Sequence, residues 1–324
     1  MNERPRMVRV TASNQCPVCQ HGSWCLIAPD KSASICARVE SKKKCGEAGW
    51  LHVHSEQKQY TPPPRRTVAE KPMLDWSRIA MGYATKFTDA KREELANILR
   101  LPTAALINLR GLGADDSEAG TVYLFPERNG DGLICGLNRR FPNGEKKFVP
   151  GGNRGLTLPQ GWSNVGELLY VVEGPTDCMA MNYAGLSVWG RFSNIGGASL
   201  IAQALKKVEG KPIVVIVGEN DRRFSEERNR WEWPGLAGAV SVARELQKLV
   251  KNEVHWTLPP EDYKDARDYM TSEYFDGRDW NERGKDVNEE LLSRSQLYSN
   301  FPEEYGSIEE LHQSIGFDSN RWKY

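Results

Sequence analysis

The strongest constraint on the fold is a regular alternation of strand and helix patterns that begins at Leu168. The apolar stretches LLYVV, LSVWG, PIVVIVG and EVHWTL alternate with helical patterns such as SLIAQALKKV and GLAGAVSVARELQKLV. Strands joined by helices of this length predict an α/β domain with a parallel sheet that is covered on both faces. In such sheets ligands bind beyond the carboxyl ends of the strands, so the chemistry is expected there.

Carboxylates are predicted to gather at that edge, because three of the strands are followed directly by acidic residues. These acids are Glu173, Asp177, Glu219, Asp221 and Asp265. Like charges in one place repel each other, and the divalent cation Mg²⁺ prefers a few carboxylates together with water and substrate phosphates. Each acid alone is better explained as a solvated strand end or as a residue favoured by a helix dipole. Together, at three strand ends, they favour a metal-dependent site.

A cluster of cysteines marks the N-terminal part of the chain, which holds five of the seven. Cys16 and Cys19 form a C-x-x-C pair, and Cys36 lies on the far arm of a hairpin predicted for WCLIA and ASICA. This layout is typical of a zinc ribbon, in which thiolates take tetrahedral positions around a structural zinc ion. The fourth ligand stays open among Cys45, which is preferred, His52 and Cys25.

Charge is distributed unevenly along the 324 residues, although the formal net charge is zero. Residues 1–72 carry 12 Lys and Arg against 6 Asp and Glu, and residues 161–324 carry 19 against 27. The basic front is expected to contact nucleic acid, and the acidic back to hold metal. No apolar run of about 18 residues is present, and MNERPRMVRV lacks the apolar core of a secretory signal. A cytoplasmic protein without membrane contact is therefore expected.

A basic hairpin is predicted before the α/β region, because TVYLF and LICGLNRRF are rich in β-formers and are separated by the turn ERNGDG. Cations at and after it could bind a template strand or nucleoside triphosphates, and Lys264 could join them, although a solvated strand face would look similar. The predicted cations of this hairpin are Arg139, Arg140, Lys146, Lys147 and Arg154.

Three motifs resemble the TOPRIM module of primases, topoisomerases and some nucleases: EGPTD at 173–177, GEND at 218–221 and YKDARD at 263–268. The cysteine module, closed by GEAGWLH, resembles the zinc domain of bacterial and phage primases, and the basic segment resembles the subdomain that precedes TOPRIM in them. The resemblance implies that Glu173 acts as general acid or base and also contacts the metal, and that Glu219, Asp221 and Asp265 hold Mg²⁺ or Mn²⁺. Glu219 departs from the family's Asp.

The family resemblance implies a stand-alone DNA primase that makes short RNA primers on single-stranded DNA from ribonucleoside triphosphates. No G-x-x-x-x-G-K-[ST] motif is present, so no fused helicase is expected, and a separate helicase is expected if the chain acts at a replication fork. A plasmid, phage or other mobile element would fit such a stand-alone enzyme. The alternatives are a metal-dependent nuclease and a non-catalytic DNA-binding replication regulator. The segment between Asp221 and Gly235 is longer than usual in the family and is expected to form a loop over the site.

The expected organisation along the chain is a zinc ribbon, a small mixed α+β subdomain and a parallel-sheet domain. The corresponding boundaries are 1–54 for the ribbon, 55–72 for a Pro-rich linker, 73–160 for the basic subdomain, 161–280 for the catalytic domain and 281–324 for a charged helical tail.

Overall fold

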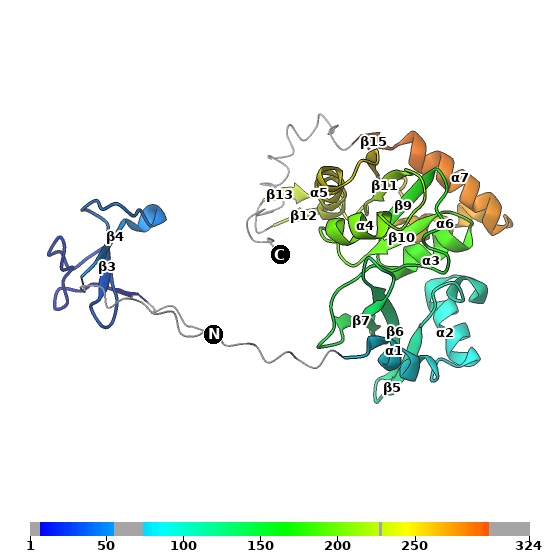
Figure 1. Cartoon of the computed structure of the whole chain (residues 1–324), viewed down its shortest axis with the longest axis horizontal. Helices are drawn as coiled ribbons and strands as arrows, with labels where there is room; N and C mark the ends of the chain where they lie inside the picture. Colours follow the sequence, from blue (N-terminus) through cyan, green and yellow to red (C-terminus); the bar gives the residue numbers. More distant parts are fainter. Residues whose placement is uncertain (1–6, 55–73, 227–228, 298–324) are drawn as a thin grey trace. The chain divides into compact units, whose positions relative to one another are not determined.

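The computed structural model describes residues 7–54, 74–226 and 229–297. The chain divides into two compact units, 1–72 and 73–324, each of which is described by itself (Figure 1). The expected linker at 55–72 lies outside the described residues, as does the expected charged tail beyond residue 297. In the part of the chain that is described, no helix is long and apolar enough to cross a membrane.

The N-terminal unit is a small antiparallel sheet, as the predicted hairpin requires. Its strands follow one another in the order β1 (Val8–Arg9), β2 (Leu26–Ile27), β3 (Ala33–Cys36) and β4 (Trp50–Val53), with a 3-10 turn, η1, at Gly46–Ala48. A core this small holds few apolar side chains, and its centre includes three cysteines, Cys16, Cys25 and Cys36. Units of this size usually need a metal or a disulfide for stability.

The second unit begins with helices packed beside an antiparallel sheet. The helical elements are α1 (Trp76–Ala84), α2 (Asp89–Leu99) and the 3-10 turn η2 (Thr103–Leu106). Helix α2 begins where Thr88 caps the backbone N–H of Lys91, and it ends at Arg100, whose left-handed conformation precedes Leu101-Pro102. The strands, in sheet order, are β5 (Gly113–Ser117), β6 (Gly120–Arg128), β7 (Ile134–Arg140) and β8 (Lys146–Phe148).

The predicted parallel sheet is present in the rest of this unit, and its strand order places two acidic strand ends together. The order is β10-β9-β11-β14-β15. After β9 the chain forms β10 on one side of that strand and then crosses over to form β11 on its other side. The crevice where this direction reverses, between β9 and β11, is the usual ligand position in such sheets. The strands are β9 (Leu168–Glu173), β10 (Val188–Arg191), β11 (Ile213–Val217), β14 (Val254–Thr257) and an antiparallel edge strand, β15 (Gln296–Leu297).

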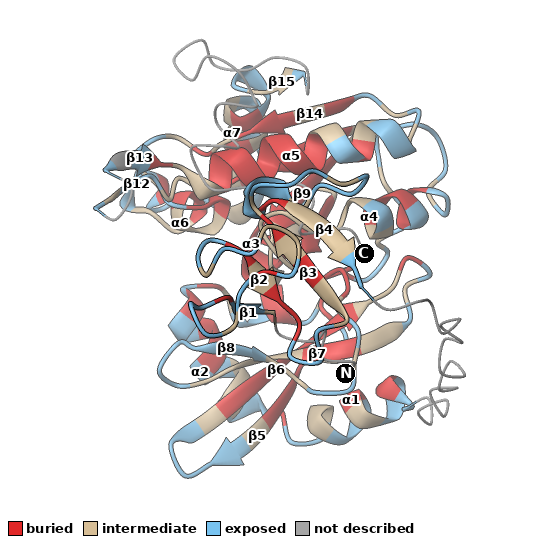
Figure 2. Ribbon diagram, turned by 90° about the vertical axis from the view of Figure 1, so that its left-hand side faces the viewer, coloured by how far each residue is buried: buried red, intermediate tan, exposed pale blue. Residues whose placement is uncertain are grey.

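Two hydrophobic cores cover the two faces of this sheet. Leu169 and Val171 of β9 pack against one set of helices, while Tyr170 and Val172 face the other. This alternation is what a strand buried on both sides produces. Helices α4 (Ala198–Leu205) and α5 (Pro234–Leu249) cover the first face, and α3 (Pro175–Tyr183), α6 (Ala266–Met270), the 3-10 turn η3 (Glu273–Phe275) and α7 (Trp280–Ser293) cover the second (Figure 2).

Helix α7 shows that the first part of the charged tail packs on the sheet, a structural role that was not predicted from the sequence. Val287 and Leu291 are fully buried in the second core, and the hydroxyl of Tyr170 on β9 bonds to Asn288. A capping box formed by Asp279 and Glu282 begins the helix. This part of the tail therefore belongs to the packed α/β layer.

Candidate active site

The acidic strand ends and the basic hairpin meet in one cavity of about 380 Å³ in the second unit. One wall comes from β6, β7 and β8 and contributes Arg140 and Lys146; the other comes from the carboxyl edge of the parallel sheet. The acids that line this cavity are Glu173, Asp177, Glu219 and Asp265, together with the buried Glu127. The site therefore combines a carboxylate floor with a cationic wall, an arrangement suited to a metal and a phosphate together.

Glu173 ends β9 and stands beside a fully buried arginine. Gly174, at φ 84°, turns the chain sharply, and Pro175 opens α3 in the position where its missing N–H costs nothing. The guanidinium of Arg191 lies 3.8 Å from the Glu173 carboxylate and donates to the carbonyls of Ser193, Asn194 and Val217. Burial raises the pKa of Glu173 above its usual range, Arg191 opposes this, and the nearby Glu219 and Asp221 add to it.

Glu219 and Asp221 follow β11, and different partners hold each of them. The Glu219 carboxylate lies 3.3 Å from Nζ of Lys264. Burial lowers the pKa of Lys264, but the charge and hydrogen bond of Glu219, together with the charges of Asp265 and Asp177, outweigh this and leave the pKa raised. Asp221 accepts a hydrogen bond of 2.7 Å from the backbone N–H of Gly235, in the first turn of α5. Gly235 is required there, because an added Cβ would stand 2.1 Å from the Glu219 carbonyl oxygen.

Asn220, between these acids, fastens the segment that carries Lys264 and Asp265. Its side-chain amide lies within 2.9 to 3.0 Å of the carbonyls of Pro259, Pro260 and Tyr263, and its backbone N–H donates to the Lys264 carbonyl. The central residue of the acidic triplet therefore positions the neighbouring loop.

Asp177 and Asp265 are buried acids, of which the first joins α3 to α6 and the second caps α6. The carboxylate of Asp177 accepts the backbone N–H of Arg267 at 3.0 Å, and Asp265 caps α6 by accepting the N–H of Asp268 at 2.7 Å. Burial raises the pKa of Asp177 well above its usual value, and the charge of Asp265 adds to this. The structure thus gives Asp177 a packing role that the sequence did not reveal.

The Asp177→Asn variant is expected to be more stable than the parent chain at neutral pH, measured in EDTA by urea unfolding. Asparagine retains an oxygen that can accept the Arg267 N–H. Because the pKa of Asp177 is raised on folding, the parent loses stability as pH rises from the unfolded-state pKa through the folded-state pKa. The advantage of the variant should be absent near pH 3 and reach on the order of 1 kcal/mol at pH 8.

The exposed acid Asp276 provides the control for this measurement, since Asp276→Asn should leave the pH dependence unchanged. A variant Asp177→Asn that is less stable than the parent at every pH would show that the Asp177 charge stabilises the fold.

The six predicted cations do not all reach the cavity. Arg140, Lys146, Arg154 and Lys264 line it, whereas Arg139 and Lys147 do not. Neighbours on a strand point to opposite faces, which separates Arg139 from Arg140 and Lys146 from Lys147. Burial and the charge of Arg267 lower the pKa of Arg140.

Arg154 is engaged with protein groups rather than left free for a ligand. Its guanidinium pairs with the buried Glu127 at 2.8 to 2.9 Å and donates to the Phe192 carbonyl. The rings of Phe148 and Phe192 lie 5.1 and 5.2 Å from it. Arg154 therefore joins the antiparallel sheet to the loop after β10 and positions the cationic wall.

Four cysteines of the N-terminal unit form a second candidate site. The sulfur atoms of Cys16, Cys19, Cys25 and Cys36 all lie within 4.8 Å of one another. Backbone N–H groups of Ala37 and Val39 point at two of the sulfurs, at 3.4 and 3.3 Å. Burial raises the pKa of Cys19, but the backbone N–H of His21 and the neighbouring thiols lower it to about 7. Four thiols with N–H donors around them fit a structural zinc ion.

The structure places Cys25, one of the three alternatives for the fourth ligand, in this group, and not the preferred Cys45. Leu26 pairs with Ile35 in the hairpin, so Cys25 stands opposite Cys36. Cys45 instead precedes η1, where its backbone N–H bonds to the Gly49 carbonyl. The hairpin register, read from WCLIA and ASICA, carried the signal that identifies Cys25.

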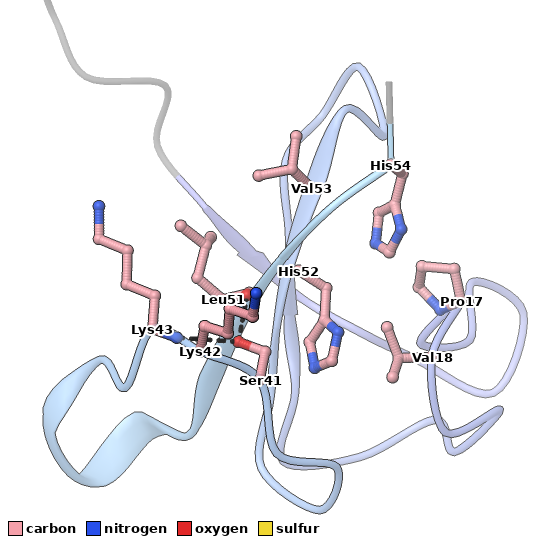
Figure 3. Close-up of a pocket in the computed structure, with 9 residues that line it drawn as sticks. All are labelled: Pro17, Val18, Ser41, Lys42, Lys43, Leu51, His52, Val53 and His54. Carbon is pink, nitrogen blue, oxygen red and sulfur yellow. Dashed lines mark hydrogen bonds between the residues drawn. The ribbon is translucent and has the colours of Figure 1, made fainter. Parts of the chain in front are cut away.

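His52, the other alternative, also lies apart from the four cysteines. Its Nε2 is 3.1 Å from the Val39 carbonyl oxygen, and it lines a shallow cavity of about 450 Å³ with Lys42, Lys43 and His54 (Figure 3). Trp24 of the same unit is 74% exposed and has a positive φ of 69°. A large residue in this conformation is strained, which is a common mark of a functional position.

Among known proteins, the chain is similar to solved structures. No family model and no curated protein matches the sequence. The chain is similar to primase catalytic cores. The RNA polymerase domain of the Mycobacterium tuberculosis primase DnaG is 18% identical at a TM-score of 0.44, with 76% of this chain and 93% of that one covered. A DnaG catalytic core is 12% identical at 0.48, covering 76% and 98%.

A DnaG catalytic domain bound to single-stranded DNA is similar at the same level, with 13% identity, a TM-score of 0.45 and coverage of 74% of this chain and 90% of that one.

Sequence reasoning missed several residues of the acidic cavity. Arg191 and Arg267 are cations among its acids, and Asn138 lines its cationic wall. Arg191 had a signal, since it follows an apolar strand at the edge where the acids were sought. In the described part of the chain, the cysteine group alone brings three or more metal-ligand atoms this close. The carboxylates remain further apart, with Arg191 and Lys264 among them.

Proposed function

We propose that this chain is a DNA primase that joins ribonucleoside triphosphates along a single-stranded DNA template. The observation that carries the proposal is the shared cavity, in which Arg140 and Lys146 face Glu173, Glu219 and Asp265. Carboxylate oxygens suit Mg²⁺ or Mn²⁺. Burial raises the pKa of Glu173, and the neighbouring Glu219 and Asp221 charges add to this, so the donor set fits such an ion. A cation held by Glu219, Asp221 and Asp265 would offset charge on the triphosphate and favour departure of pyrophosphate.

The chain's own groups supply the remaining steps. Arg140, Lys146 and Lys264 would bind the triphosphate and the template backbone. Glu173 would accept the proton of the attacking 3′-hydroxyl, a task favoured by its raised pKa. The 3′-oxygen then forms a bond to the α-phosphorus, and the bond from that phosphorus to the pyrophosphate oxygen breaks. The cysteine module would bind the template, with the exposed Trp24 stacking on a base and neighbouring groups contacting phosphates.

The deciding experiment incubates the full chain with labelled ribonucleoside triphosphates, Mg²⁺ or Mn²⁺ and mixed single-stranded templates. Short labelled products are expected, and they should be lost in EDTA and in the Asp221→Asn variant. Shortened DNA without nucleotide incorporation would establish a nuclease instead. If the chain binds DNA but neither joins nucleotides nor cuts DNA, it would be a non-catalytic DNA-binding regulator.

A further inference from the structure

The long segment after Asp221 forms a hairpin instead of the expected loop. Strand β12 (Arg223–Ser225) pairs with β13 (Arg230–Glu232), and Phe224 stands directly opposite Trp231. Opposite residues in an antiparallel pair project on the same face. The Phe224 and Trp231 rings meet edge to face, with centroids 5.6 Å apart. One face of the hairpin is therefore aromatic.

This aromatic face stays open and is bordered by positive charge. Phe224 is 46% exposed and Trp231 57% exposed. The guanidinium of Arg222 lies 5.1 Å from the Trp231 ring centroid. The guanidinium of Arg223, on the opposite face, lies 3.9 Å from the Glu232 carboxylate, and its side chain is 70% exposed. Residues 222–232 contain four Arg and three Glu, in a half of the chain that is otherwise strongly acidic. A cross-strand pair explains the contact between the rings, but not this exposure or the added cations.

The hairpin is rooted at the acidic cavity. It starts immediately after Asp221, and the hydrogen bond from the Gly235 N–H to Asp221 closes the segment at its other end. Glu219, two residues before Asp221, lines the cavity. The segment that carries the aromatic face therefore follows a residue of the cavity closely in the chain.

We infer that the hairpin is a stacking surface for the bases of a single-stranded nucleic acid, an inference that rests on the proposed function and adds a contact to it. Aromatic faces bordered by cations are what unpaired bases and their phosphates require, because every base offers a face and every linkage a negative charge. A duplex hides its base faces, so the chemistry selects a single strand.

The first test is photo-crosslinking of the full, zinc-loaded chain without Mg²⁺, Mn²⁺ or nucleotides, to single strands that carry one 5-iodouracil at successive positions. Irradiation joins this base to an aromatic ring in contact with it. Mass spectrometry of the peptides is expected to find a crosslink within residues 222–233. Crosslinks confined to other parts of the chain would overturn the inference.

The second test measures binding of labelled single strands by fluorescence anisotropy, with the zinc-loaded chain and without Mg²⁺ or Mn²⁺. The Phe224→Ala/Trp231→Ala double variant is expected to bind about tenfold more weakly than the parent chain. Phe224→Tyr/Trp231→Phe should restore binding, and the difference should vanish on a strand without bases. Ile107→Ala/Leu133→Ala, which removes exposed apolar residues elsewhere in this unit, is the matched control. Binding within twofold of the parent would contradict a stacking surface.

These measurements involve no nucleotide transfer, so the two proposals fail separately. A chain that crosslinks through the hairpin but makes no primers would retain the stacking surface and lose the primase function. If the parent chain makes primers and the Phe224→Ala/Trp231→Ala variant binds single strands as tightly as the parent, the primase function would stand and the stacking surface would be lost.

Discussion

Cys25→Ser is expected to abolish zinc binding by the N-terminal unit and to unfold that unit, whereas Cys45→Ser should leave both unchanged. Cys25 belongs to the four-sulfur group, and Cys45 does not. The core of this unit is five buried residues, of which three are cysteines. Apparent binding energies of about 10–16 kcal/mol are typical of structural zinc in such small units, so losing one ligand removes most of their stability.

The measurement is zinc content per chain by mass spectrometry of the metal, with limited proteolysis of residues 7–54 as the readout of folding. One zinc per chain is expected for the parent, for Cys45→Ser and for His52→Ala, and close to none for Cys25→Ser. Zinc loss in Cys45→Ser with retention in Cys25→Ser would overturn the assignment. The second unit should unfold at the same urea concentration in all variants, since each unit has its own core.

Glu173→Gln is expected to slow primer synthesis by about 10²- to 10⁴-fold, the usual contribution of a positioned acid or base. Glutamine has almost the same shape, so packing beside Arg191 is preserved while the proton acceptor is lost. The assay is the initial rate of nucleotide incorporation at saturating triphosphate and Mg²⁺.

Glu167→Gln provides the matched control, because Glu167 is an exposed glutamate just before the other end of the same strand, β9. Its rate should stay within twofold of the parent. A Glu173→Gln variant that keeps the parental rate would remove Glu173 from the reaction and leave its pairing with Arg191 as its only role.

Elements with strong local patterns could be predicted from the sequence. The alternation after Leu168 gave the parallel sheet, because strands buried on both faces are continuous apolar runs. The turn ERNGDG gave the β6–β7 hairpin, whose register pairs Tyr123 with Arg140. The strand ends brought Glu173, Glu219 and Asp265 to one cavity, since parallel strands end at the same edge.

Features that depend on contacts between distant segments could not be predicted in this way. The burial of Asp177 depends on Arg267, ninety residues later in the chain. Engagement of Arg154 depends on Glu127 and Phe192, which other elements supply. The β12–β13 hairpin was missed because RRFSEERNRWEW has neither a turn dipeptide nor a run of β-formers, and a single aromatic pair spans its strands.

The fastening of Asn220 to the loop at 259–264 has a mechanical consequence. Two acid-bearing segments that are far apart in the sequence behave as one rigid piece, because four hydrogen bonds from a single residue join them. If a phosphate binds Lys264 and displaces it, the backbone between Glu219 and Asp221 would move with it, because the loop that carries Lys264 is not free to move independently. The spacing of these acids is therefore set before any ligand arrives, and ordering them adds little entropic penalty to binding.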